Sequence, residues 1–109
     1  MIGCGNPDFS KVTRDQVGCI PKSVSYHVYT GEKFKDCDNI DYSSRGATGD
    51  TIVMTIDMRP FKSRLSFSKN GNDMGTVFLG LSYWGDIYIM FSLWEIGHRI
   101  KVVKYEVVE

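Results

Sequence analysis

The dipeptide Asn70-Gly71 constrains the fold of this chain more than any other feature, because it predicts a two-residue type I′ turn. Both central residues of that turn need positive φ, which asparagine tolerates and glycine adopts freely, and its twist matches the strands it joins. We therefore expect residues 65–69 to fold back onto residues 72–78 as a hairpin. The expected cross-strand pairs are Lys69 with Asn72, Phe67 with Met74, and Leu65 with Thr76.

Other stretches show the alternation typical of β-strands. Residues 51–57 alternate with β-branched side chains, and with the hairpin that follows they predict a three-strand meander. Residues 25–29 and 33–34 predict a short hairpin around a turn at 30–32. Residues 86–94 are almost continuously apolar, which favours a central strand covered on both faces or an irregularly buried one. The pattern is completed by a strand end at residues 2–4, a structured polar loop over 35–49, a turn-rich connection over 79–85 and a last strand over 99–108.

These strands and the chain length define the expected fold class. The chain has 109 residues, of which 42% are hydrophobic and 13% aromatic, and this suits one domain with one core. Six or seven short strands separated by glycine-rich turns, with few helix signals, are typical of two packed sheets. The sequence therefore predicts an all-β antiparallel β-sandwich, formed as a single domain by residues 1–109.

Charge and cysteine content narrow the expected partners and location. The 13 basic and 13 acidic residues give a net charge of zero, and no stretch carries the single-sign field of a nucleic-acid or acidic-membrane binder. No apolar run approaches the roughly 20 residues of a membrane helix, and the first ten residues lack a signal-peptide pattern. Three cysteines, an odd number, without a glycosylation sequon favour reduced thiols. We expect a soluble, cytoplasmic protein that binds neither nucleic acid nor membranes.

No residue pattern predicts catalysis, a cofactor or a bound metal. His27 and His98 are the only histidines, neither lies in a recognised nucleophile motif, and both are better explained as surface or structural histidines. The three cysteines contain no Cys-x-x-Cys pair, so a zinc site is not expected. Asp36 and Asp38 are more typical of a solvated turn than of an acid–base dyad. We therefore expect that the chain is not an enzyme.

A series of motifs runs in order through essentially the whole chain. The most specific is LSFSKNGNDMGTVF at residues 65–78. The others are Ile2-Gly3-Cys4, Lys22-Ser23-Val24-Ser25-Tyr26-His27, Gly31-Glu32-Lys33-Phe34, Gly49-Asp50-Thr51-Ile52, Ile56-Asp57, Asp86-Ile87-Tyr88-Ile89 and Phe91-Ser92-Leu93. In this order they resemble the SPRY domain of the B30.2/SPRY family, whose hairpin has the pattern LSFxxNGxxxGxAF. Val24 stands where the family has Trp, and Ile89 stands where it prefers Pro.

The resemblance implies a sandwich of the SPRY or concanavalin-like jelly-roll type that is N-terminally truncated. Members of the family usually begin two or three strands earlier than this chain does. Such a truncation would leave a strand edge and an apolar face uncovered, and exposed edges are templates for pairing with another chain. We therefore expect the chain to form a homo-oligomer along that edge or to dock a partner there.

The resemblance also implies a set of partner-binding residues. SPRY domains are protein-interaction modules, and those that capture peptides use a shallow cleft built from loops at one end of the sandwich. Phe34 matches the aromatic residue after the first hairpin, and Trp94 with its loop Glu95-Ile96-Gly97 matches a second element of that cleft. Trp94 is the expected anchor, since aromatic side chains carry much of the binding energy of interfaces, but a core Trp that caps the sandwich explains it as well. Further candidates, with lids over a small core as the alternative, are Tyr29, Tyr83 and Trp84.

The sequence thus favours a non-enzymatic interaction module that binds a short peptide or a protein surface through loops at one end of the sandwich. One alternative is an assembly fragment that self-associates or docks through its uncovered sheet edge. Another is a carbohydrate-binding sandwich in which Trp84 and Trp94 stack on sugar rings. Trp94→Ala should abolish peptide binding under the first hypothesis and leave oligomerisation intact under the second.

Overall fold

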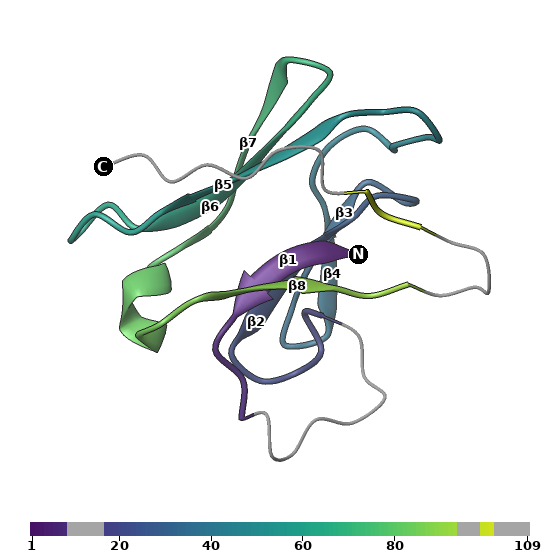
Figure 1. Cartoon of the computed structure of the whole chain (residues 1–109). Helices are drawn as coiled ribbons and strands as arrows, with labels where there is room; N and C mark the ends of the chain where they lie inside the picture. The colour runs from purple at the N-terminus through teal and green to yellow at the C-terminus, as the bar shows by residue number, and fades with distance from the viewer. Residues whose placement is uncertain (9–16, 94–98, 102–109) are drawn as a thin grey trace.

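The computed structural model describes residues 1–8, 17–93 and 99–101. Within these residues the chain forms two antiparallel sheets packed together, so the predicted all-β antiparallel sandwich is confirmed (Figure 1). A short 3-10 helix, η2 (Leu81–Trp84), leads from the smaller sheet back to the larger one. The strands are β1 (Ile2–Gly5), β2 (Ser23–His27), β3 (Glu32–Lys35), β4 (Asp38–Asp41), β5 (Ile52–Asp57), β6 (Arg64–Lys69), β7 (Asn72–Leu79) and β8 (Tyr88–Phe91).

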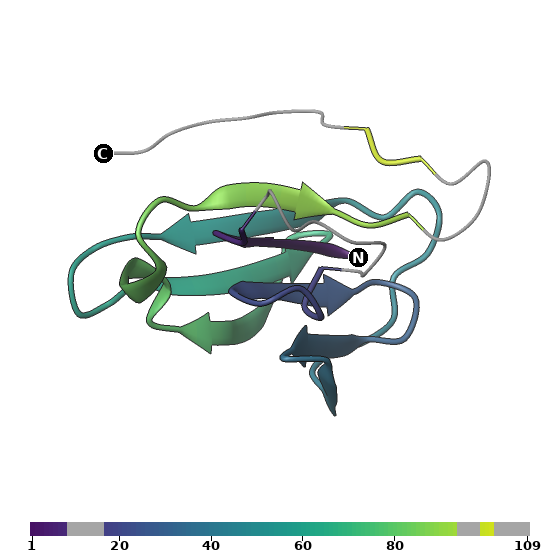
Figure 2. The ribbon, with the colours of Figure 1, turned by 90° about the horizontal axis from the view of Figure 1, so that it is seen from below.

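The larger sheet contains β4-β3-β2-β1-β8 and the smaller sheet β5-β6-β7, counted over the described residues. Figure 2 shows β8, β1, β2 and β3 side by side in this order. The smaller sheet is the meander expected from the sequence. β2 and β3 are the expected short hairpin, with the turn at residues 28–31.

The central turn has the predicted backbone conformation. Asn70 and Gly71 have φ values of 51° and 84°, as a type I′ turn requires, and Lys69 lies opposite Asn72 as expected. The Asn70 side chain also holds the preceding loop, because its Oδ1 accepts a hydrogen bond from the Thr51 amide at 2.9 Å and its Nδ2 donates to Asp50 at 3.0 Å. Asn70 therefore forms the turn with its backbone and fixes the start of β5 with its side chain.

The predicted register of the hairpin is wrong beyond the first pair. Phe67 lies opposite Gly75 rather than Met74, and Leu65 lies opposite Phe78 rather than Thr76. Two β-bulges cause the shift, because β7 has an extra residue at each of two points where the register breaks. Gly75 lies at the first break with φ of 90°, a conformation that glycine adopts without a steric penalty. The second bulge carries Val77, whose side chain is buried.

The core lies between the two sheets and is centred on Tyr26 of β2 and Phe67 of β6. Their ring centroids are 5.4 Å apart, and both side chains are almost completely buried. The Tyr26 hydroxyl donates to the Ser44 carbonyl at 2.7 Å, so its polar group is satisfied at the edge of the core. Other buried residues of this cluster are Cys4, Val24, Leu65, Val77 and Leu81.

Two elements differ from the sequence-based expectations. The polar segment 35–49 contains β4, a strand whose four residues are all exposed. β8 lies at the end of the larger sheet rather than at its centre, counted over the described strands, and Tyr88, Ile89 and Phe91 are each more than 40% exposed. Its apolar run therefore reflects an exposed surface and not burial on both faces. The expected last strand over 99–108 falls mainly outside the described residues.

The expectation of reduced cysteines is wrong for two of the three. Cys19 and Cys37 form a disulfide, with their Cα atoms 4.1 Å apart. The fold brings them together because the Cys37 amide donates to the Gly18 carbonyl at 2.9 Å, which joins the segment before β2 to the β3–β4 turn. The odd number of cysteines suggested that none is paired, but it arises because Cys4 remains as a free, buried thiol.

Candidate functional site: a groove between the two sheets

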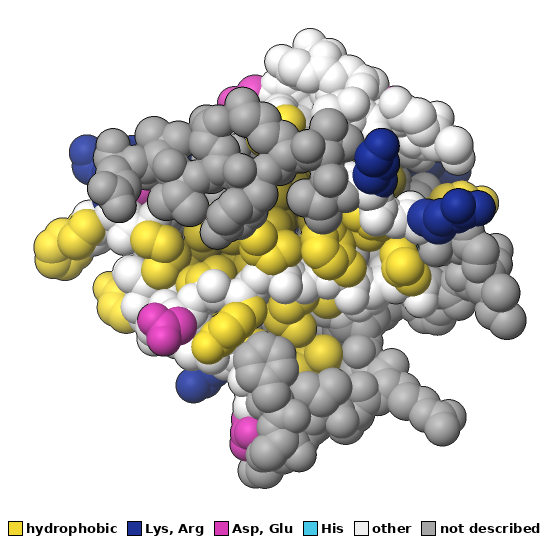
Figure 3. Space-filling model, in the orientation of Figure 1, with side chains coloured by type: hydrophobic (Ala, Val, Ile, Leu, Met, Phe, Trp, Pro, Cys, Tyr) yellow, Lys and Arg dark blue, Asp and Glu magenta, His cyan; other side chains and the backbone are white. Residues whose placement is uncertain are grey.

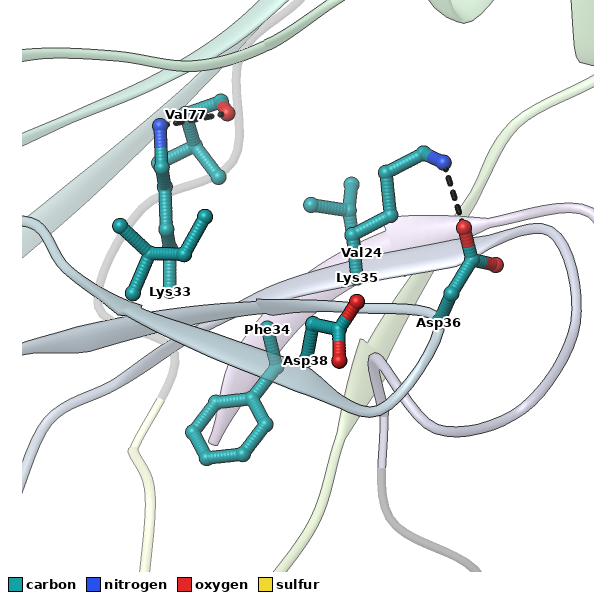
Figure 4. Close-up of a pocket in the computed structure, with 8 residues that line it drawn as sticks. Val24, Lys33, Phe34, Lys35, Asp36, Asp38 and Val77 are labelled. Carbon is teal, nitrogen blue, oxygen red and sulfur yellow. Dashed lines mark hydrogen bonds and ion pairs between the residues drawn. The ribbon is translucent and has the colours of Figure 1, made fainter.

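An open groove of about 290 Å³ lies where the β3–β4 hairpin of the larger sheet faces β7 of the smaller sheet. Its lining residues come from β2, β3, the β3–β4 turn, β4 and β7. Lys33, Lys35 and Val24 project to the same side of the hairpin (Figure 4). The full lining is Val24, Lys33, Phe34, Lys35, Asp36, Asp38, Ile40 and Val77.

Strand alternation explains which side chains enter the groove. Val24 lies opposite Lys35 in the β2–β3 pair, and Lys35 lies opposite Asp38 in the β3–β4 pair, so all three share one face of the sheet. Lys33 and Ile40, another opposed pair, lie on that same face. The groove therefore combines an apolar base with charged side chains of both signs.

Two side chains, one from β3 and one from the residue directly after β4, reach across to β7 near the groove. Lys33 Nζ donates a hydrogen bond to the Val77 carbonyl at 3.5 Å, and the Tyr42 hydroxyl donates to the Gly75 carbonyl. Burial raises the pKa of Tyr42 to about 12, so its hydroxyl remains a donor across the physiological pH range. Both acceptors belong to β7, the last strand of the smaller sheet among the described residues.

Lys35 connects the groove to an aromatic pair. Its Nζ lies 5.4 Å from the centroid of the Phe78 ring and 2.7 Å from an Asp36 carboxylate oxygen. Phe78 in turn stacks on Trp84, with centroids 4.8 Å apart and an angle of 18° between the planes. The Lys35–Asp36 ion pair is exposed and stabilises little by itself, but it sets the charge at this end of the groove.

β4 forms the outer wall of the groove and lies at the end of its sheet, counted over the described strands. Ile40 is 58% exposed although it is a large apolar side chain. The Asn39 side chain donates to Glu32 of β3, and no described strand pairs with the outer edge of β4. Such an edge can accept another extended chain.

The β3–β4 turn that presents this wall is unusual in its residues. Asp36 and Cys37 have φ values of 52° and 63°, the same type of turn that Asn70 and Gly71 form in the smaller sheet. Cysteine has no local preference for positive φ. Its disulfide to Cys19 and its amide bond to Gly18 hold it there instead.

Of the residues predicted from the sequence, those that the structure describes do not come together in one site. The Phe34 backbone borders the groove, but its ring points to the other side of β3 (Figure 4) and makes an edge contact with His27 at 5.7 Å. Tyr83 is 88% exposed on η2, whereas Trp84 is half-buried against Phe78. The remaining predicted residues of the loop, Trp94, Glu95, Ile96 and Gly97, lie outside the described residues.

Tyr29 is exposed but lies at the opposite end of the larger sheet from η2. Gly5 of β1 is paired with both Ser23 and Tyr88, so the starts of β2 and β8 share one end of the sheet. η2 precedes β8 at that end, while Tyr29 follows β2 at the other. Tyr29 and the Tyr83–Trp84 pair therefore cannot contact one short ligand together.

Apart from Phe34, whose backbone borders the groove, sequence reasoning did not select the residues that line it. Lys33 and Lys35 alternate with Glu32 and Phe34, which signals that both lysines share a face of β3. Val77 offered no such signal, because the second β-bulge determines where its side chain lies. Only the packing of the two sheets brings these residues together.

The described residues have no group of three or more histidine, cysteine, aspartate or glutamate side chains that could hold a metal ion. Burial lowers the pKa of His27, and the ring contacts Thr30 Oγ1 at 3.1 Å and the edge of Phe34. These contacts hold the His27 ring against the β2–β3 hairpin, as expected for a structural histidine. In the described part of the chain, no helix has the length and apolar character needed to cross a membrane.

Comparisons with known proteins add no relative. No protein-family model matches the sequence, and no curated protein matches it. The resemblance to the SPRY domain rests on the motifs quoted above and stays a prediction. Function must therefore be argued from the groove and its surroundings.

Proposed function

We propose that this chain is a non-enzymatic protein-interaction module that binds an extended segment of a partner protein in the groove between β4 and β7. The observation that carries the proposal is the outer edge of β4, which pairs with no other strand in the described part of the chain and lies beside a groove with an apolar base. An extended peptide could add to this edge as a further strand, with backbone hydrogen bonds supplying affinity and the groove selecting alternate side chains.

The groove is better suited to peptide side chains than to a whole small molecule. Its volume of about 290 Å³ lies at the lower end of ligand sites, and it is open rather than enclosed. Val24 and Val77 offer an apolar contact at its base, and Ile40 exposes apolar surface on its outer wall. We expect every second residue of the bound segment to point to the groove side of the sheet, with an apolar residue beside Ile40.

Charges at the rim provide selectivity. Lys33 and Lys35 lie on one strand of the hairpin, and Asp36 and Asp38 lie on its turn and second strand. A partner segment with charges of both signs would match this rim, and one with a single sign would meet repulsion. Rim charges of this kind set partner choice and association rate more than affinity.

The proposal is compatible with a SPRY-type module, a soluble cytoplasmic location and a lack of nucleic-acid or membrane partners, which all remain predictions. It differs from the sequence-based proposal in its site. The predicted cleft used the loop at Trp94, whereas the groove lies beside β4. One substitution in each region distinguishes the two sites.

A selection of short random peptides displayed on phage, with the oxidised chain as bait, tests the proposal. Peptides that are selected should bind Ile40→Lys at least about tenfold more weakly than the wild type by calorimetry, because the new charge blocks the apolar wall. Tyr29→Ala, which removes an exposed aromatic side chain that does not line the groove, is the control and should bind normally. Peptides that bind the Ile40→Lys variant normally but do not bind the Trp94→Ala variant would place the site at the loop instead.

Self-association is a second candidate function, favoured by the composition of β8. This strand has the sequence Tyr-Ile-Met-Phe without a charge, whereas β4 carries Asp38 and Asp41 at its ends. Ile89 is 43% exposed on it, and uncharged exposed edges pair readily with a second copy. Ile89→Lys should then convert an associating species to a monomer in sedimentation experiments, while a wild-type chain that is monomeric at high concentration would exclude this function.

A further inference from the structure

We infer that the Cys19–Cys37 disulfide is a redox switch that holds the β3–β4 hairpin in position and thereby controls the groove. Reduction releases the turn at Asp36 and Cys37, and β4 then loses its fixed position opposite β7. The effect on peptide binding rests on the proposed function, but the release of the hairpin does not.

The two tight turns of the protein show why this one depends on a covalent bond. Asn70-Gly71 and Asp36-Cys37 both connect adjacent strands through two residues with positive φ. Asparagine and glycine favour this conformation, so the first turn is locally stable. Cysteine resists it, because its Cβ atom crowds the backbone when φ is positive. The second turn therefore needs support from outside its own sequence.

That support comes from a segment distant along the chain. The disulfide joins Cys37 to Cys19 across a sequence separation of 18 residues, and the Cys37 amide donates to the Gly18 carbonyl. Gly18 packs closely on Phe34, because a Cβ atom at residue 18 would lie 2.6 Å from the Phe34 Cβ. These contacts tie the turn to the outer face of β3.

Apart from Tyr42 at its C-terminal end, whose amide donates to the Gly31 carbonyl and whose ring packs on Tyr26, β4 has few other contacts that hold it. Among the described strands it pairs only with β3, and all four of its residues are exposed. A strand supported by one neighbour and no apolar burial is marginally stable in water. Loss of the disulfide should therefore loosen β4 before it affects β6 and β7, whose residues Leu65, Phe67 and Val77 lie in the core.

The chemical step is a thiol–disulfide exchange with an external dithiol as the reductant. Cys37 is an exposed residue, and a thiolate of the dithiol attacks its Sγ atom. The Cys19–Cys37 bond breaks, and Cys19 leaves as a thiolate that takes up a proton. The second thiol of the reductant then attacks the mixed disulfide and releases Cys37 as a thiol. The protein gains two electrons and two protons, and the dithiol becomes a disulfide.

Cys4 does not compete in this exchange. It is fully buried on β1 in contact with the core, and burial raises its pKa to about 12, so the reactive thiolate is absent at neutral pH. The switch therefore involves one defined pair of cysteines.

Amide hydrogen exchange of residues 38–41, measured before and after reduction with dithiothreitol, tests the inference without any ligand. Exchange should accelerate by roughly tenfold on reduction, which corresponds to about 1.4 kcal/mol, while the amides of β7 change little. The double variant Cys19→Ser with Cys37→Ser should behave like the reduced wild type. Equal exchange of residues 38–41 in the oxidised and reduced chains would overturn the inference.

A second variant tests whether the disulfide stabilises β4 through the β3–β4 turn. The triple variant C19S/D36N/C37G places the residues of the central turn between β3 and β4, so it should keep slow exchange at 38–41 under both oxidising and reducing conditions. Exchange as fast as in the double serine variant would contradict the role of the turn.

Peptides selected on the oxidised chain provide the second readout. They should bind the reduced wild type more weakly and bind the triple variant equally under both conditions. Unchanged binding to a reduced chain whose β4 exchanges faster would overturn control of the groove. If no peptide is selected at all, the proposed function fails, and hydrogen exchange alone decides whether the disulfide controls the hairpin.

Discussion

Lys35 Nζ lies over the ring of Phe78, 5.4 Å from its centroid, so that a strand of the larger sheet is linked to the last strand of the smaller one. The space-filling view shows an apolar band that continues across several elements of the fold (Figure 3). Phe78 is half-buried and stacks on Trp84. This ring therefore contributes both a cation–π contact and aromatic packing at the junction of the two sheets.

Phe78→Ala should lower the free energy of unfolding by about 2 kcal/mol in urea denaturation, somewhat less than the cost for a fully buried phenylalanine. Lys35→Met, which keeps an apolar stem but removes the charge, should cost about 0.5 kcal/mol. Lys62→Met, at an exposed lysine in the turn before β6, is the matched control. Equal effects of the two lysine substitutions would show that the cation–π contact does not stabilise the fold.

Two glycines should respond to alanine for different physical reasons. At Gly71 an added Cβ would meet no atom within 4 Å, so Gly71→Ala should cost only the conformational penalty of positive φ, about 1 kcal/mol. At Gly3 the Cβ would lie 2.0 Å from the Val24 carbonyl oxygen, and the clash with backbone should cost about 3 kcal/mol. Thermal unfolding of both variants measures the difference. A Gly3→Ala protein as stable as Gly71→Ala would mean that β1 and β2 are not paired as described.

Stability should depend on pH through Asp57. The hydrogen bond from the Arg59 side chain, its amide and its charge lower the pKa of Asp57 to about 2, below its ordinary value of 3.8. A folded-state pKa below the unfolded value means that the stabilisation is present above about pH 4 and is lost as the pH falls toward 2. Arg59→Gln should therefore flatten the dependence of the urea midpoint on pH in this window. An unchanged slope between pH 4 and 2 would show that the pair makes no contribution.

The cysteines predict a defined thiol count. In the oxidised chain no thiol should react rapidly with Ellman's reagent, because Cys4 is fully buried and burial raises its pKa to about 12. Unfolding without a reductant should expose one thiol per chain, and unfolding with a reductant should expose all three. Three reactive thiols without a reductant would exclude the disulfide. Because disulfides are rare in the cytosol, the count in protein alkylated at lysis also tests the predicted cytoplasmic location.

Local chemistry made much of the fold predictable. The Asn70-Gly71 turn, the alternation of β5 and the hairpin of β2 and β3 depend on residues close together in the sequence, and all three are present. The register of β7 was not predictable in the same way. Its bulges allow Val77 to reach the core, and that requirement comes from the facing sheet rather than from the hairpin itself.

The groove could not be predicted from the sequence, because it too depends on contacts between distant residues. β4 is built from aspartate, asparagine and one isoleucine, which favour loops, and its position depends on a disulfide to a residue far along the chain. Lys33 and Val77 meet although 44 positions separate them. The motif resemblance selected aromatic residues instead. Of those that the structure describes, Phe34 borders the groove with its backbone, and Trp84 is linked to it through Phe78 and Lys35.

The hydrogen bonds from Lys33 and Tyr42 to β7 have a consequence for the behaviour of the protein at high concentration. β7 is the longest described strand, with eight residues, and its exposed backbone would otherwise favour fibril growth. With the Gly75 and Val77 carbonyls already bonded to the side chains of Tyr42 and Lys33, a chain that approaches this strand must first displace them. These two bonds should therefore slow amyloid-like stacking on the longest described strand.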